Sequence, residues 1–203
     1  SFRRRENRGS GAADQIATAL AQALPTGLRA LTAAAASDQD SYTVTKAFAD
    51  QYGLAAIGDL TKAPQPLKIA ANSEFATRPY GPDGVKQVYG VDLQLVPVED
   101  SGGPLTLRAL TDGTVQIADL YTADPSIAKN GLVILSDPKN LILPQNVTPI
   151  VSTKVNTSAA AAIEAVNGQL SVADLQQLNA RSVDEQAKSA DIASAWLKSK
   201  GLV

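Results

Sequence analysis

The feature that most constrains the fold of this chain is an alternation of short apolar runs with short helix-like segments between Pro66 and Pro138. Apolar runs of strand length, such as LKIAA and VQIADL, are separated by segments bounded by glycine or proline. Strands that alternate with helices are typical of βαβ units, whose strands form a mainly parallel or mixed sheet. This part of the chain is therefore predicted to be an α/β domain.

The segments on either side of this domain differ in character. Residues 13–24 carry apolar side chains at helical spacing, and further helices are expected between residues 158 and 201. Within the latter region, Ser171 followed by Asp174 is a capping signal. Residues 28–34 are predicted to form a strand, and residues 37–46 a polar loop that leads into a helix.

The composition excludes several kinds of chemistry. The chain has no histidine and no cysteine, which excludes Cys/His zinc sites, thiol catalysis and a Ser-His-Asp triad. The sequence also contains no P-loop, no dinucleotide-binding glycine motif and no nucleophile elbow. We therefore expect no cofactor, no metal site and no enzymatic activity. A small α/β enzyme that uses Asp, Glu and Tyr remains one alternative function.

Charge and hydropathy exclude two further classes of partner. The net charge is −2, whereas a nucleic-acid binder needs a basic surface, so we expect no nucleic-acid partner. The basic run at residues 2–8 is interpreted as a solvated tail. Apolar runs stay well short of the roughly 20 residues that a membrane-spanning helix needs.

Three side chains stand at predicted strand ends or loops, and two of them, Arg78 and Tyr121, stand at the carboxyl ends of strands. Tyr42 follows the polar stretch SDQDS, Arg78 follows the strand LKIAAN, and Tyr121 ends the strand VQIADL. Ligands of such sheets gather at the carboxyl ends of the strands. An arginine there is either a solvated charge or a bidentate clamp for a carboxylate or phosphate. Each tyrosine, taken alone, is also compatible with an ordinary half-buried position.

Together, these positions lie in segments that resemble a known family. The substrate-binding proteins of osmoprotectant ABC transporters, which take up glycine betaine, choline and carnitine, are similar to this chain from Leu28 to Val203, with order and spacing kept. The segments are SDQDSYTVTKAFADQYGLAAIGDL, LKIAANSEFATRPYGPDGVKQVYG, ALTDGTVQIADLYTADPSIAKNGLVILSDPKNLILPQNVTPIVS and LNARSVDEQAKSADIASAWLKSKGL. The most specific parts of the resemblance are EFATRPYG and ADLYTAD.

The resemblance implies a type II periplasmic-binding-protein-like α/β fold with a mixed sheet. In that fold, two lobes are joined by crossover segments and close on a ligand held in the cleft between them. Residues 43–145 are expected to form the complete second lobe. Residues 1–42 and 146–203 are expected to form a remnant of the first lobe, with the crossover segments and the C-terminal helices, so that most of the first lobe is lacking. Closure is expected about segments near residues 36–42 and 145–152.

The resemblance also implies roles for the candidate residues. Tyr42 and Tyr121 match walls of an aromatic cage, and Arg78 matches the arginine that binds the carboxylate of the ligand. A quaternary ammonium group has no N–H to donate, so aromatic faces are its natural partners. A planar guanidinium matches a carboxylate.

Two further positions bear on this site. The family often has a tyrosine where this chain has Gln145, and because an amide lacks an aromatic face, we expect the cage to be weaker or more polar there. Asp38 or Asp40 either faces the cation as a compensating anion or is a solvated loop acid.

The resemblance implies a small-molecule ligand, an ABC permease as partner, and an extracytoplasmic location, either periplasmic or lipid-anchored at the cell surface. Self-association of the chain is left open. The alternative function is a bilobal effector-binding sensor or regulatory domain for a different small polar or aromatic ligand, because the same architecture serves both purposes.

Overall fold

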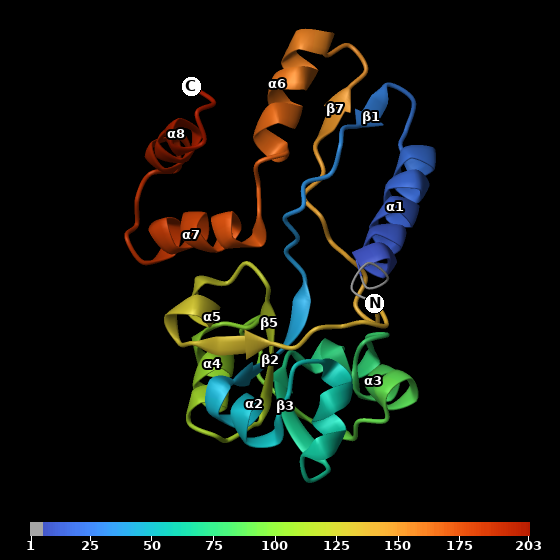
Figure 1. The fold of residues 1–203 in the computed structure, drawn as a ribbon, viewed down its shortest axis with the longest axis vertical. Helices are drawn as coiled ribbons and strands as arrows, with labels where there is room; N and C mark the ends of the chain where they lie inside the picture. Colours follow the sequence, from blue (N-terminus) through green and yellow to red (C-terminus); the bar gives the residue numbers. More distant parts are fainter. Residues whose placement is uncertain (1–5) are drawn as a thin grey trace. The chain divides into compact units, whose positions relative to one another are not determined.

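The chain folds into two compact units, which are described separately. The computed structural model describes residues 6–203 and the side-chain surroundings from residue 12 onward. One unit comprises Ser1–Asp38 and Pro144–Val203, and the other comprises Gln39–Leu143 (Figure 1). We call them unit 1 and unit 2. The basic run at residues 2–8 lies outside the residues whose side chains are described.

Unit 2 is built on a five-stranded mixed sheet with the strand order β4-β3-β5-β2-β6. Strand β3 runs parallel to both β4 and β5, and β2 runs antiparallel to both β5 and β6. The strands are β2 Asp40–Thr45, β3 Leu67–Ala71, β4 Leu93–Pro97, β5 Ile117–Tyr121 and β6 Leu132–Ile134. The predicted α/β class and mixed sheet are confirmed.

Helices cover both faces of this sheet, and each face has its own apolar core (Figure 1). The larger core packs side chains of β2, β3 and β5 against α2, α3 and the 310 helices η2 and η3. The smaller core packs the opposite face against α4 and α5. A fully buried aliphatic or aromatic side chain contributes roughly 1.5–3 kcal/mol. The elements are α2 Lys46–Tyr52, η2 Ile57–Lys62, η3 Ser73–Thr77, α3 Pro82–Tyr89, α4 Pro104–Thr111 and α5 Pro125–Lys129.

The prediction of a polar loop over residues 37–46 is wrong, because strand β2 begins at Asp40 and lies inside the sheet. Its polar side chains are accommodated by mutual hydrogen bonds. The hydroxyls of Ser41 and Thr43 are 2.8 Å apart, and that of Ser41 donates to the carbonyl of Leu120 at 2.7 Å. Burial of satisfied hydroxyls, together with buried Val44, makes this polar-looking segment a core strand.

Unit 1 contains a two-stranded antiparallel sheet and four helices among its described residues. Strand β1 pairs with β7, and Leu28 lies opposite Ser152. The strand predicted over residues 28–34 therefore ends earlier, at Ala30. The elements are α1 Glu6–Ala23, β1 Leu28–Ala30, β7 Ile150–Ser152, α6 Thr157–Asn167, α7 Val172–Val183 and α8 Ser189–Ser199.

The predicted cap of α7 is present and ties two helices of unit 1 together. The Ser171 hydroxyl accepts a hydrogen bond from the Asp174 amide at 3.1 Å, and the Asp174 carboxylate accepts one from the Ser171 amide at 3.0 Å. The same carboxylate accepts a bond from Trp196 Nε1 at 3.0 Å and pairs with Lys200 Nζ at 2.9 Å. These contacts hold α8 against the first turn of α7.

Within the described part of the chain, no helix is both long enough and apolar enough to cross a membrane.

Candidate functional site

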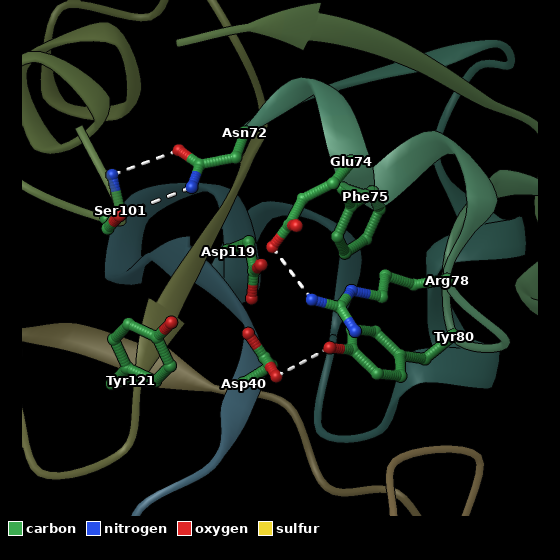
Figure 2. A pocket seen from close by; sticks show the side chains of 10 residues that line it. Asp40, Asn72, Glu74, Phe75, Arg78, Tyr80, Ser101, Asp119 and Tyr121 are labelled. Carbon is green, nitrogen blue, oxygen red and sulfur yellow. Dashed lines mark hydrogen bonds and ion pairs between the residues drawn. The ribbon is translucent and has the colours of Figure 1, made fainter. Parts of the chain in front are cut away.

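A polar pocket opens in unit 2 at one edge of the sheet (Figure 2). The space between its side chains amounts to about 350 Å³, part of which is open solvent. All of the residues that line it belong to unit 2: Asp40, Asn72, Glu74, Phe75, Arg78, Tyr80, Ser101, Gly102, Asp119 and Tyr121.

The topology of the sheet explains why these residues meet. The parallel strands β3, β4 and β5 all direct their carboxyl ends to this edge, and the segments that follow β3 and β4 supply Asn72 and Ser101. Tyr121 is the last residue of β5. Because β2 is antiparallel, its amino end lies at the same edge and brings Asp40 there. The site thus forms where ligands of α/β sheets bind.

Of the two predicted aromatic residues, Tyr121 lines the pocket and Tyr42 is buried in the core. Tyr121 lines the pocket and is 44% exposed. Tyr42 is only 1% exposed, and its hydroxyl donates to the carbonyl of Tyr80 at 2.5 Å. Burial raises the pKa of the Tyr42 hydroxyl, so it stays a neutral donor. Tyr42 therefore belongs to the core, where it supports the segment that carries Tyr80, and its ring does not line the pocket.

Tyr80 is the pocket aromatic that the sequence analysis did not assign. Its hydroxyl donates to Asp40 Oδ2 at 2.7 Å, and its ring lies edge-on to Phe75 at 5.9 Å between centroids. Burial, followed by the bond to Asp40, raises the pKa of this phenol. Tyr80 stands inside EFATRPYG, the most specific part of the family resemblance, which was the available signal.

Arg78 lines the pocket and forms an ion pair there. Its Nη2 atom is 2.8 Å from Glu74 Oε1, one turn earlier along the chain. This hydrogen bond and the charge of Glu74 raise the pKa of the guanidinium. The pair is open to solvent, with the side chains of Arg78 and Glu74 46% and 63% exposed. The guanidinium can therefore exchange partners without desolvating a buried group.

Two carboxyl groups lie at the centre of the pocket. In the β2–β5 register, Asp40 is opposite Tyr121 and Tyr42 is opposite Asp119, so all four side chains share one face of the sheet. In Figure 2, the carboxyls of Asp40 and Asp119 appear between Tyr121 and the pair formed by Arg78 and Tyr80. Burial first, then the charge of Asp40 and a hydrogen bond with it, raise the pKa of Asp119 to about 8.

The remaining wall of the pocket is the turn at Ser101 and Gly102, which is held by hydrogen bonds to Asn72. Asn72 Nδ2 donates to Ser101 Oγ at 3.2 Å, and the Ser101 amide donates to Asn72 Oδ1 at 3.0 Å. Ser101 and Gly102 have φ values of +54° and +76°. A Cβ on Gly102 would lie 3.1 Å from the carbonyl oxygen of Asp119, so this turn packs closely on β5.

Gln145 lies in unit 1 and does not line this pocket. Its amide donates to Ser37 Oγ at 3.2 Å, and its carbonyl accepts from the amide of Asp38 at 3.3 Å. Of the predicted site residues, the pocket therefore brings together Asp40, Arg78 and Tyr121. Across the described residues, no group of three or more Asp or Glu side chains is arranged to hold a metal ion.

The fold of this chain is similar to that of solved ABC-transporter substrate-binding proteins. One, described as a glycine betaine/carnitine/choline ABC transporter, has a TM-score of 0.83 at 23% identity, over 93% of this chain and 71% of that one. Apo YehZ from Escherichia coli has a TM-score of 0.74 at 26% identity, over 100% and 77%. Lactococcal OpuAC complexed with glycine betaine has a TM-score of 0.55 at 14% identity, over 86% and 68%.

The family model for the substrate-binding domain of the ABC-type glycine betaine transport system matches residues 10–199. The chain belongs to this family, which confirms the resemblance seen in the sequence. Members of the class bind small-molecule ligands, work with an ABC permease and are extracytoplasmic.

Proposed function

We propose that this protein binds a quaternary ammonium solute, such as choline, glycine betaine or carnitine, in the pocket of unit 2 and delivers it to an ABC permease. The observation that carries this proposal is the meeting of Tyr121, Tyr80, Arg78 and two carboxyl groups at the carboxyl edge of the sheet. Membership of the glycine betaine family supports the same class of ligand.

The chemistry of the pocket suits such a ligand. A quaternary ammonium group is bound by aromatic faces and anions, and a good aromatic contact contributes roughly 0.5–2 kcal/mol. Tyr121 offers a partly exposed ring, and the carboxyl pair of Asp40 and Asp119, which shares one proton near neutral pH, offers negative charge beside it. Arg78 is the group that meets the carboxylate of betaine or carnitine, in exchange for Glu74.

Tyr42 and Gln145 do not line the pocket of unit 2. Tyr42 acts through the hydrogen bond from its hydroxyl to the Tyr80 carbonyl, which positions the segment that carries Arg78 and Tyr80. The predicted ligand contact of Gln145 stays a prediction.

The proposed mechanism is ligand-linked closure of the two units. The chain passes from one unit to the other twice, after Asp38 and after Leu143, which is the connectivity that a hinged two-lobe protein needs. Unit 2 would be the second lobe of the family, and the closed, ligand-bound form would be the one that the permease recognises. Attachment by a lipid anchor or free movement in the periplasm are both compatible with this function.

Replacement of Tyr121 tests the proposal. In Tyr121→Ala, loss of the ring face is expected to weaken choline and glycine betaine binding by one to two factors of ten, since each factor of ten is about 1.4 kcal/mol. Isothermal titration calorimetry of both ligands measures the change, with Tyr121→Phe as the matched control that keeps the ring. Unchanged affinity in the alanine variant would remove Tyr121 from the site.

A further inference from the structure

The charges that line the pocket do not balance. The lining includes three acidic side chains and one basic side chain: Asp40, Glu74, Asp119 and Arg78. Arg78 is already matched by Glu74 at 2.8 Å. Arg78 lowers the pKa of Asp119 by less than burial and Asp40 raise it, and the ion pair that Arg78 forms within the pocket is with Glu74 and not with Asp40 or Asp119.

The two carboxyls are positioned as a pair by the sheet itself. They lie on one face of adjacent strands as diagonal neighbours, because Asp119 is two residues from Tyr121, the residue opposite Asp40. The hydroxyl of Tyr80 donates to Asp40 at 2.7 Å. The titratable or charged groups around Asp119 are Asp40 and Tyr42 from β2, Glu74 from η3, Arg78 and Tyr80 from the segment after η3, and Tyr121 from β5. Two close carboxylates repel each other when both are ionised, so the pair retains a proton unless a cation replaces it.

We propose, on the basis of the proposed function, that Asp40 and Asp119 determine specificity by making the pocket select ligands with a net positive charge over zwitterions. A choline-like cation neutralises the pair and takes the place of its proton. A betaine-like zwitterion brings a carboxylate of its own, which must either lie near Asp40 and Asp119 or displace Glu74 from Arg78.

The selection has a pH signature because the cation competes with the proton on the pair. The raised pKa of Asp119 places this competition near neutral pH. The affinity for choline should rise as pH increases from about 6 toward about 8, by at most a factor of ten per pH unit for one released proton. A zwitterion, with no net charge to replace the proton, should show a much flatter profile.

The experiment is calorimetric titration of wild type, Asp119→Asn and Asp40→Asn with choline and with glycine betaine at several pH values. In Asp119→Asn, choline affinity is expected to fall at least tenfold, glycine betaine affinity to stay within about threefold, and the pH dependence for choline to disappear. Asp83→Asn is the matched control, because Asp83 is an exposed acid of α3 outside the pocket. The pH profile of wild type provides a second test that does not depend on how the variants fold.

The outcomes separate this inference from the proposed function. If both ligands bind wild type but Asp119→Asn weakens them equally, or the choline profile is flat with pH, the role of the carboxyl pair is overturned and the proposed function stands. If neither ligand binds folded wild type at any pH, the proposed function itself fails.

Discussion

At the scale of single residues, Asp119 carries a consequence for stability that can be measured without any ligand. Its pKa is about 8 in the folded protein and 3.8 ordinarily. Between these values the folded protein holds a proton that the unfolded chain has released. The free energy of unfolding therefore falls as pH rises through this window, by at most about 1.4 kcal/mol per pH unit for this group, and levels off above it.

Asp119→Asn removes this linkage, so the variant should gain stability relative to wild type as pH rises from about 5 to about 8. Urea denaturation at a series of pH values measures the difference. Asp83→Asn should show no such trend, because Asp83 is exposed. A stability difference for Asp119→Asn that is constant with pH would show that the carboxyl is ionised throughout.

Arg78 and Glu74 give a second prediction at this scale. In Glu74→Gln the guanidinium loses its ionic partner, so glycine betaine affinity should rise several-fold while choline affinity changes little or falls. In Arg78→Gln the order reverses, and glycine betaine should lose about tenfold in affinity. Equal effects of Arg78→Gln on both ligands, measured by calorimetry, would contradict a carboxylate-binding role for Arg78.

Some of the residues that line the pocket could be singled out from the sequence, and others could not. Arg78 and Tyr121 could be singled out because they stand at strand ends within family-specific segments; both line the pocket, and their ligand contacts stay predictions. Asp119 stands two residues before Tyr121 on the same face of β5, but its closeness to Asp40, which gives it a place in the pocket, depends on the register between β2 and β5. Tyr42 shows the reverse case, since its position near the site was clear but its burial depends on packing against Phe75 and Tyr80.

At the scale of elements, the turn that carries Arg78 is held by two glycines. A Cβ on Gly81 would lie 2.1 Å from the carbonyl oxygen of Phe75, and one on Gly84 would lie 1.7 Å from that of Pro79. No side chain fits at either distance, so glycine is required at both positions by the close approach of α3 to the preceding chain.

Gly84→Ala should therefore move the segment from Arg78 to Tyr80. We expect a loss of about 1–3 kcal/mol in the free energy of unfolding and weaker ligand binding in the protein that still folds. Urea denaturation and calorimetry measure both effects. Gln87→Ala, at an exposed position of the same helix, is the control and should be nearly neutral. Wild-type stability in Gly84→Ala would mean that the close approach is relaxed in solution.

Strand β2 shows the limit of element prediction. Its sequence DSYTVT alternates polar with apolar side chains, which is typical of a half-buried strand, but it directly follows the polar residues SDQ, and the whole stretch is interpreted as a loop from the sequence alone. The hydroxyls of Ser41 and Thr43 are satisfied only by partners that the sheet brings to them. Strands β3, β4 and β5 were predictable because their apolar runs need no such partners.

At the scale of the whole molecule, the family assignment rests on order and spacing over nearly the entire chain, and the family model matches residues 10–199. The division into units at Gln39 and Pro144 is a property of long-range contacts, whereas the sequence suggested a boundary from resemblance alone.

Ligand-linked closure predicts a smaller radius of gyration with saturating choline than without it, measured by small-angle X-ray scattering. An unchanged radius would count against closure and leave the pocket intact.

The proposed function requires that the pocket of unit 2 binds a quaternary ammonium group. The most direct measurement is a calorimetric titration of wild type with choline, glycine betaine, carnitine, tetramethylammonium and an uncharged polyol. We expect the quaternary ammonium compounds to bind, with a Kd for choline in roughly the micromolar range, or about −8 kcal/mol, and the polyol not to bind. Binding of the polyol alone, or no heat from any quaternary ammonium compound, would contradict it.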